Sequence, residues 1–211
     1  RSATLRAQCA ARCIPSPLST PRVGKRKTKE GTPWFTWMNT TGMHFWTHID
    51  AKWKGKSGLN DYADGMLKLD DIVGQFLAKL KELGVDENTI VIFTTDNGVH
   101  QATWPDAGVT WFNNEKTTNW EGGFRVPCMA MFPERFGVPK GKVITDVTSH
   151  LDWVPTLMAA AGDEKIGDKL KAGTFLPGEI LAMGRVLLVA GGGCSGGYFT
   201  GSCTRIGSCF L

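Results

Sequence analysis

The stretch Thr89-Ile-Val-Ile-Phe-Thr-Thr95, followed by Asp96-Asn97-Gly98, decides the fold class of this chain. Its first seven residues form an apolar, β-branched run of the kind that a parallel sheet buries on both faces. Asp-Asn-Gly then ends the run sharply, as a turn does. The sequence therefore predicts a buried strand over 89–95, with polar side chains at its carboxyl end.

Strand and helix patterns alternate on either side of this strand. Aromatic and apolar runs predict further strands, and apolar residues at helical spacing predict helices. The predicted elements are a strand over 34–39, a helix over 62–83 that stops at Gly84, a strand over 128–132, and a helix that opens with a capping box at 149–152 and stops at Gly162. This order predicts an α/β fold, with helices flanking a mostly parallel sheet.

The charge of the 211-residue chain divides it into three parts. Residues 1–29 hold eight basic and no acidic residues, residues 30–163 hold 11 basic and 17 acidic, and residues 164–211 hold five and three. We expect a basic tail over 1–30, a folded middle over 31–163, and a Gly/Ser/Cys-rich tail over 164–211 that is disordered or unrelated to the middle. The basic tail lacks interleaved aromatic residues, which argues against a nucleic-acid partner. No apolar run is long enough for a membrane span.

Three polar segments could carry chemistry. Asp96 and Asn97 offer oxygen atoms that suit Ca²⁺ or Mg²⁺, although the same tripeptide is also a common turn. Lys116 could direct an ammonium group at an anion, although a lysine taken by itself is more often a surface residue. His44 and His48 follow the first strand and could act as a general acid or an anion contact. The pattern does not separate these two histidines.

Two further histidines, His100 and His150, have no better claim to a functional role. His150 falls at the start of the predicted helix that opens with the capping box. We therefore expect it to belong to that helix start.

Taken together and in this order, these segments resemble the sulfatase family. The resemblance covers residues 31–163 and rests on FTTDNG (93–98), KTTNWEGGFRVP (116–127) and SHLDWVPTLMAAAG (149–162). It is closest to arylsulfatases and implies an alkaline-phosphatase-like α/β fold, here with an incomplete sheet. The chain would then be a C-terminal portion of the catalytic domain.

The resemblance also implies roles for individual residues. Asp96 and Asn97 match two ligands of the family's active-site Ca²⁺. Lys116 matches the lysine that contacts the sulfate group. His44 matches the histidine that touches the sulfate and assists the leaving group, with His48 as the less favoured position. Fixed positive charges of this kind would stabilise the negative charge that develops on the leaving oxygen.

Parts of the family pattern are missing from this sequence. The family nucleophile is a formylglycine made within a C-x-P-S-R or similar motif, whereas Cys13-Ile-Pro-Ser-Pro17 ends in Pro. The upstream Asp-Asp metal pair is also absent. Asn113-Asn114 stands where an Arg-Gly or similar pair is expected. We therefore expect negligible turnover from this chain by itself.

Two other functions compete with the arylsulfatase interpretation. One is a phosphodiesterase or phosphonate hydrolase of the same superfamily. The other is a non-catalytic protein that holds sulfated glycans through Lys116 and Arg125. For an arylsulfatase or a protein that holds sulfated glycans, the expected partner is a small sulfate ester or a sulfated glycan. The oligomeric state and the localisation stay open, and a bacterial parent would be periplasmic or secreted.

Overall fold

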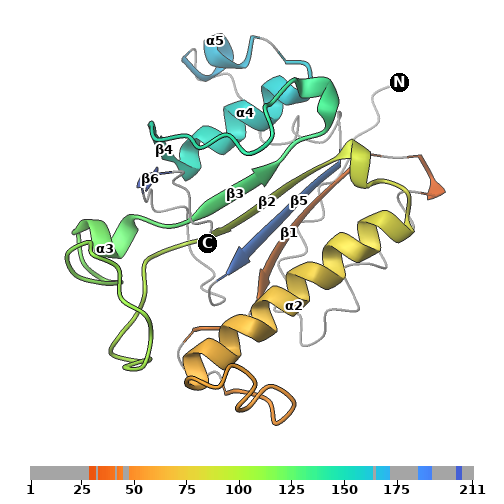
Figure 1. Ribbon diagram of the computed structural model, residues 1–211. Helices are drawn as coiled ribbons and strands as arrows, with labels where there is room; N and C mark the ends of the chain where they lie inside the picture. Colours follow the sequence, from red (N-terminus) through yellow and green to blue (C-terminus); the bar gives the residue numbers. More distant parts are fainter. Residues whose placement is uncertain are drawn as a thin grey trace.

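The computed structural model describes residues 29–31, 33–40, 42–44, 48–163 and 165–171, and the backbone of 185–191 and 203–205. Four strands form the main sheet, in the order β1-β5-β2-β3 (Figure 1). Their bounds are Trp34–Thr40 for β1, Thr89–Thr95 for β2, Cys128–Met131 for β3 and Arg185–Gly191 for β5. β5 lies parallel to both β1 and β2, and β3 lies antiparallel to β2.

The register of the parallel strands sets the position of the loops that follow them. Thr40, the last residue of β1, and Thr95, the last residue of β2, both pair with Gly191 of β5. β1 and β2 therefore end at the same level. Loops that follow the carboxyl ends of parallel strands are where α/β folds place their sites.

Helix α2 (Asp61–Glu82) covers one face of the sheet. Asn60 caps its start by accepting a 2.8 Å hydrogen bond from the backbone N–H of Ala63, and Gly84 follows its end with a φ of +64°. The apolar side chains of α2 pack against β1 and β2. The buried residues of this cluster are Trp34, Met38, Phe76, Leu80, Val85 and Val91.

The opposite face of the sheet carries a second apolar cluster. Ile90 and Ile92 of β2 pack there with Cys128 of β3. Helix α4 (Trp153–Ala160) covers them, and Trp153 and Leu157 lie against the cluster. Because alternate residues of a strand point to opposite faces, β2 is buried on both sides, as its apolar run predicts.

The remaining described elements are short. They are η1 (Asp86–Asn88), α3 (Glu121–Phe124), η2 (Glu134–Phe136), β4 (Val147–Ser149), η3 (His150–Asp152), α5 (Ile166–Lys171) and β6 (Cys203–Arg205). β4 and β6 pair in a separate antiparallel sheet of two strands. Among the described residues, no helix is both long and apolar enough to cross a membrane.

The strands and helices predicted within 34–162 are all present, and most of their ends shift by one residue. The first turn of the last predicted helix is the 3-10 helix η3, so α4 begins only at Trp153. The main difference lies in residues 164–211, where we expected a tail. Strand β5 forms there and occupies the sheet position between β1 and β2. Its sequence, RVLLVAG, is an apolar run that suits a strand with neighbours on both sides. This strand was not predicted, because the Gly-rich segment that follows it led us to expect a tail over the whole of 164–211. Most of the expected basic tail, including Cys13 to Pro17, lies outside the described residues.

Candidate functional site

Asp96 and Asn97 lie directly after β2, at the carboxyl edge of the sheet. Asp96 is exposed, and one of its carboxylate oxygens accepts a long 3.4 Å hydrogen bond from the hydroxyl of Thr95. The side-chain N–H of Asn97 donates to the carbonyl oxygen of Gly98 at 2.8 Å. This bond uses the nitrogen of the amide and sets the direction of its Oδ1, the atom that can serve as a metal ligand.

Backbone hydrogen bonds bring the segment around Lys116 beside the segment that follows Asn97. The N–H of Lys116 donates to the carbonyl of Val99 at 2.8 Å, and the N–H of Gly98 donates to the carbonyl of Gly123 at 2.8 Å. The Asp-Asn-Gly and Lys-x4-Glu-Gly-Gly motifs therefore form one structural unit. Lys116 itself is half-buried.

The glycines of this unit are required by close packing of backbone against backbone. A Cβ atom on Gly122 would overlap the carbonyl oxygen of Asn114. On Gly123 it would lie 2.5 Å from the carbonyl oxygen of Thr118. Real Cβ atoms do not come this close to a backbone oxygen, so only glycine allows the loop to fold onto α3.

The backbone on either side of Lys116 has unusual conformations. Asn114 has a φ of 63° and Thr117 a φ of 77°. Asn114 stands where the family resemblance predicts Gly, and Asn is one of the few other residues that tolerates the left-handed region. For the β-branched Thr117 this region is strained, and strain of this kind clusters at functional sites.

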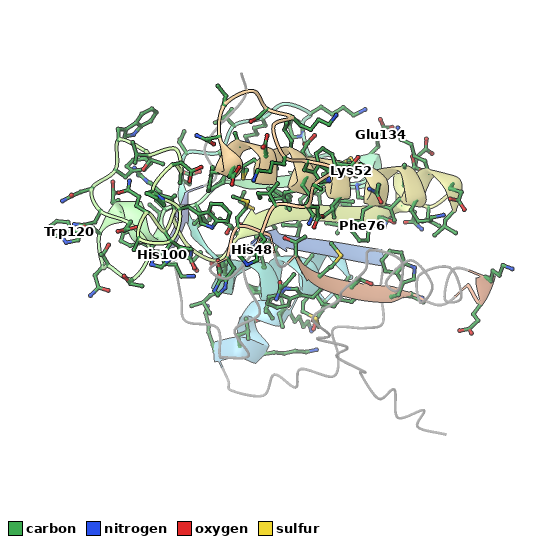
Figure 2. The ribbon with its side chains drawn as sticks, turned by 90° about the horizontal axis from the view of Figure 1, so that it is seen from below. His48, Lys52, Phe76, His100, Trp120 and Glu134 are labelled. Carbon is green, nitrogen blue, oxygen red and sulfur yellow. The ribbon has the colours of Figure 1, made fainter. Side chains whose placement is uncertain are left out.

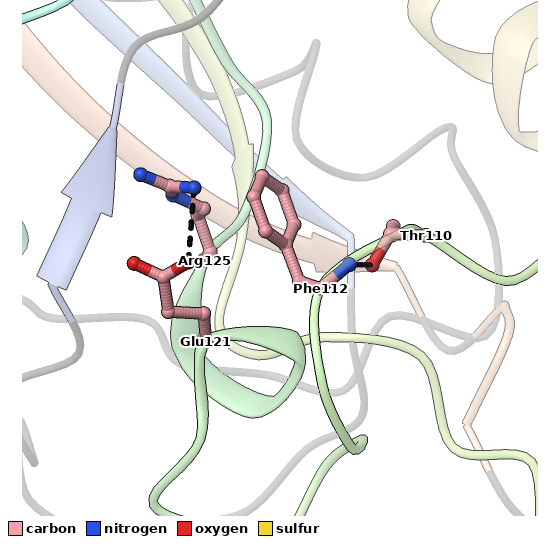
Figure 3. Close-up of polar contacts among 4 residues, drawn as sticks. All are labelled: Thr110, Phe112, Glu121 and Arg125. Carbon is pink, nitrogen blue, oxygen red and sulfur yellow. Dashed lines mark hydrogen bonds and ion pairs between the residues drawn. The ribbon is translucent and has the colours of Figure 1, made fainter.

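An aromatic and ionic brace holds this loop against α3 (Figure 3). The guanidinium of Arg125 lies 4.2 Å from the ring centre of Phe112, and its Nη1 lies 3.1 Å from a carboxylate oxygen of Glu121. The N–H of Phe112 donates to the hydroxyl of Thr110 at 3.3 Å. These contacts with Phe112 and Glu121 account for the position of the Arg125 side chain without a bound anion.

His44 follows β1 at the same edge of the sheet and is half-buried, whereas His48 is exposed. The turn before His44 packs on α2, since a Cβ atom on Gly65 would lie 2.6 Å from the sulfur of Met43. Strand β5 separates β1 from β2, so the ends of these strands lie about 10 Å apart.

The loops at the carboxyl edge form one end of the molecule. Figure 2 shows Trp120 and His100 among the loops at one end and Glu134 toward the other. The Nδ1 of His100 lies 2.7 Å from the hydroxyl of Thr103, within its own turn.

Two residues at this edge were not predicted to take part in a site. The Nε2 of His150 lies 3.1 Å from the carbonyl oxygen of Thr95, directly before Asp96. The predicted capping box and helix start at Ser149 are confirmed, but nothing in the local sequence indicates this contact. The hydroxyl of Thr40 is buried and has no hydrogen-bond partner among the described residues.

The donors at this edge suit a hard cation by their chemistry. Asp96 and Asn97 offer carboxylate and amide oxygens, the ligands that Ca²⁺ prefers, but Ca²⁺ takes six to eight oxygens. In the part of the chain that the structure describes, no group of three or more His, Cys, Asp or Glu side chains could hold a metal. The residues therefore fit one portion of a Ca²⁺ site.

Comparisons with known proteins give a consistent result. A family model described as Sulfatase matches residues 20–163. The chain is 33% identical over 150 residues to the steryl-sulfatase of Mus musculus and 31% identical over 154 residues to the N-acetylgalactosamine-6-sulfatase of Canis lupus familiaris. The crystal structure of the PsFucS1 sulfatase from Pseudoalteromonas sp. is similar, with 36% identity and a TM-score of 0.51.

The chain corresponds to only part of each of these proteins. The matches cover 68% of this chain and 24% of the steryl-sulfatase, and 72% of this chain and 29% of the N-acetylgalactosamine-6-sulfatase. The structural match covers 54% of this chain and 23% of the PsFucS1 chain. The chain thus spans less than a third of the length of these relatives.

Proposed function

The chain belongs to the sulfatase family, and on this premise we propose that residues 31–163 are part of a catalytic domain that hydrolyses sulfate esters with the help of Ca²⁺. One observation carries the proposal. Asp96-Asn97, at the carboxyl edge of the sheet, is tied to the Lys116 segment through the bond from the Lys116 N–H to the Val99 carbonyl. Oxygen ligands and a cationic side chain therefore come from one unit.

In this proposal Asp96 and Asn97 would hold Ca²⁺ through their side-chain oxygens. The cation, when bound, would supply a fixed positive charge for the oxygens of the sulfate group. Lys116 adds its ammonium as a compact charge against the same group. His44 donates a proton to the leaving oxygen, which otherwise carries the negative charge of the departing alcohol or phenol.

We also propose that this chain holds only part of the catalytic domain. The described strands form an incomplete version of an alkaline-phosphatase-like sheet. The chain alone turns over no sulfate ester, since Cys13-Ile-Pro-Ser-Pro17 lacks the Arg of the nucleophile motif and two side-chain oxygens fall short of the coordination that Ca²⁺ requires. The substrate class is a small sulfate ester or a sulfated glycan.

Metal binding by the purified chain tests the proposal. Tb³⁺ serves as a luminescent substitute for Ca²⁺, excited through the tryptophans of the chain, and Ca²⁺ should displace it. Asp96→Asn should weaken Tb³⁺ binding by about tenfold or more, which is the loss of one charged contact. Asp70→Asn, which removes an exposed carboxylate on α2, is the matched control and should leave binding unchanged.

Two results would contradict the proposal. Equal binding by wild type and Asp96→Asn would exclude the metal site at the edge of the sheet. Ca²⁺-dependent hydrolysis of 4-nitrophenyl sulfate by the purified chain would show that it needs no further nucleophile. The proposal that the chain alone is inactive would then be wrong.

A further inference from the structure

The side chain of His150 contacts the main chain at the point where β2 ends. Its Nε2 lies 3.1 Å from the carbonyl oxygen of Thr95, a residue 55 positions earlier in the sequence. A carbonyl oxygen can only accept, so the Nε2 atom carries the proton and donates it. The peptide group that receives this bond is the one that joins Thr95 to Asp96.

The position of His150 is fixed by its neighbours. The backbone N–H of Ser149 donates to Asp152 at 2.6 Å, and the N–H of Leu151 donates to the hydroxyl of Ser149 at 3.2 Å. Ser149 is the N-cap of η3, and it forms with Asp152 the capping box that opens this helix. These bonds fix the backbone on either side of His150, from which its imidazole extends.

The helix behind His150 is anchored to the strand that His150 contacts. Trp153 and Leu157 of α4 pack against the cluster of Ile90 and Ile92. Both of these isoleucines belong to β2. The helix is thus packed against β2, and the bond from His150 adds a contact at the carboxyl end of the same strand.

Asp96 is exposed, and the hydrogen bond that its carboxylate accepts from the Thr95 hydroxyl is long, at 3.4 Å. On the far side of the turn, the N–H of Gly98 is held by the Gly123 carbonyl at 2.8 Å. The turn that carries Asp96 and Asn97 is consequently fixed at its end by Gly98 and at its start by His150.

From this geometry we infer that His150 is a positioning residue, which orients the Asp96-Asn97 turn so that both side-chain oxygens face one cation. The inference rests on the proposed function, because it concerns the same Ca²⁺ site. In this role His150 would not be a ligand of the cation. It acts through the Thr95 carbonyl and limits the directions that the following peptide can take.

Two substitutions separate the hydrogen bond from the packing of the ring. His150→Phe keeps an aromatic ring and removes the donor, and His150→Gln keeps an N–H donor at a similar reach and removes the ring. Each chain is studied by amide hydrogen exchange at Asp96, Asn97 and Gly98 and by Tb³⁺ titration. Urea unfolding of each variant reports separately on global stability.

The expected result is a difference between the two variants. His150→Phe should speed exchange at the three amides by about three- to tenfold and weaken Tb³⁺ binding by a similar factor, as the loss of one hydrogen bond predicts. His150→Gln should restore both values toward wild type. If the role of His150 is merely structural, both variants should shift the urea midpoint. His150→Phe and His150→Gln should then not differ in amide exchange or in Tb³⁺ affinity.

The outcomes also distinguish this inference from the proposed function. If wild type binds Tb³⁺ and His150→Phe binds it equally well with unchanged exchange, the inference on His150 is overturned and the metal site stands. If wild type binds no Tb³⁺, the metal site and the inference that rests on it both fail.

Discussion

The backbone N–H of Gly98 donates a 2.8 Å hydrogen bond to the carbonyl oxygen of Gly123, 25 positions later in the sequence. This bond joins the turn that carries Asp96 and Asn97 to the Glu-Gly-Gly segment of α3. The two backbones approach so closely that a Cβ atom on Gly98 would overlap the carbonyl oxygen of Gly122. The proposed ligand turn and the Lys116 loop therefore depend on the absence of side chains at their junction.

Gly98→Ala should destabilise the fold by about 1–3 kcal/mol or more, because the atom that the new methyl group meets is backbone and cannot swing away. Gly74→Ala is the matched control. In α2, nothing lies within 4 Å of a Cβ at Gly74, so this substitution should stabilise the helix by about 0.5–1 kcal/mol. Urea unfolding measures both, and equal effects would exclude the close junction.

Lys116→Ala should weaken the binding of inorganic sulfate to the Ca²⁺-loaded chain by about tenfold, through the loss of one charge-assisted contact. Lys81→Ala removes the same charge from the exposed last turn of α2 and should have little effect. Chemical-shift titration with sulfate at constant ionic strength measures both affinities. Similar losses of sulfate affinity in the two variants would show that Lys116 acts only through the net charge of the chain and does not contact the anion.

The brace around Arg125 should contribute more through Phe112 than through Glu121. Stacking places the guanidinium 4.2 Å from the Phe112 ring centre, which predicts a coupling of about 0.5–1 kcal/mol in a double-mutant cycle of Arg125→Gln with Phe112→Leu. The partner Glu121 is half exposed, so the cycle with Glu121→Gln should give a smaller value. Urea unfolding of the single and double variants supplies both cycles. The reverse order would contradict the stacking role.

Asp64 should make stability depend on pH in the acid range. Hydrogen bonds from the backbone N–H and hydroxyl of Ser57, and from the N–H of Gly55, hold the pKa of its carboxyl below the ordinary value. The unfolded chain therefore takes up a proton first as pH falls below about 4, and the stabilisation is lost progressively down to the lowered pKa.

Unfolding in urea at a series of pH values from about 7 to about 3 measures this loss. Asp64→Asn should be less stable than wild type at neutral pH and show a flatter acid dependence. Asp70→Asn, on the exposed side of the same helix, should keep the wild-type slope. A slope unchanged in Asp64→Asn would assign the acid dependence to other carboxylates.

Cys128 should be unreactive in the folded chain. Burial raises the pKa of its thiol from 9.0 to about 11, so the thiolate fraction near neutral pH falls by about 100-fold. The buried side chain also blocks access of the reagent. Alkylation with iodoacetamide, read at residue 128 by peptide mass spectrometry, should be at least 100-fold slower in the folded chain than in urea. Comparable rates would show that β3 opens readily.

Local sequence predicted the elements that local forces form. The β-branched run at 89–95, the apolar period of α2 and the capping box at Ser149 each depend on neighbours within one or two turns, and each lies where it was predicted. The family motifs also led from sequence to the sulfatase family, which the comparisons confirm. The roles of Asp96, Asn97, Lys116 and His44 stay predictions, and the experiments above test those of Asp96 and Lys116.

Only the tertiary structure decided which distant segments meet. The place of β5 between β1 and β2 is set by pairing with strands about 95 to 150 positions earlier, and a Gly-rich composition concealed it. The contact of His150 with Thr95 is likewise long-range. Hydrogen bonds of this kind join atoms that chain folding brings together, so no periodicity or spacing records them. The sequence by itself determined the strand that carries Asp96 and Asn97, and the tertiary structure decided what holds that strand end in place.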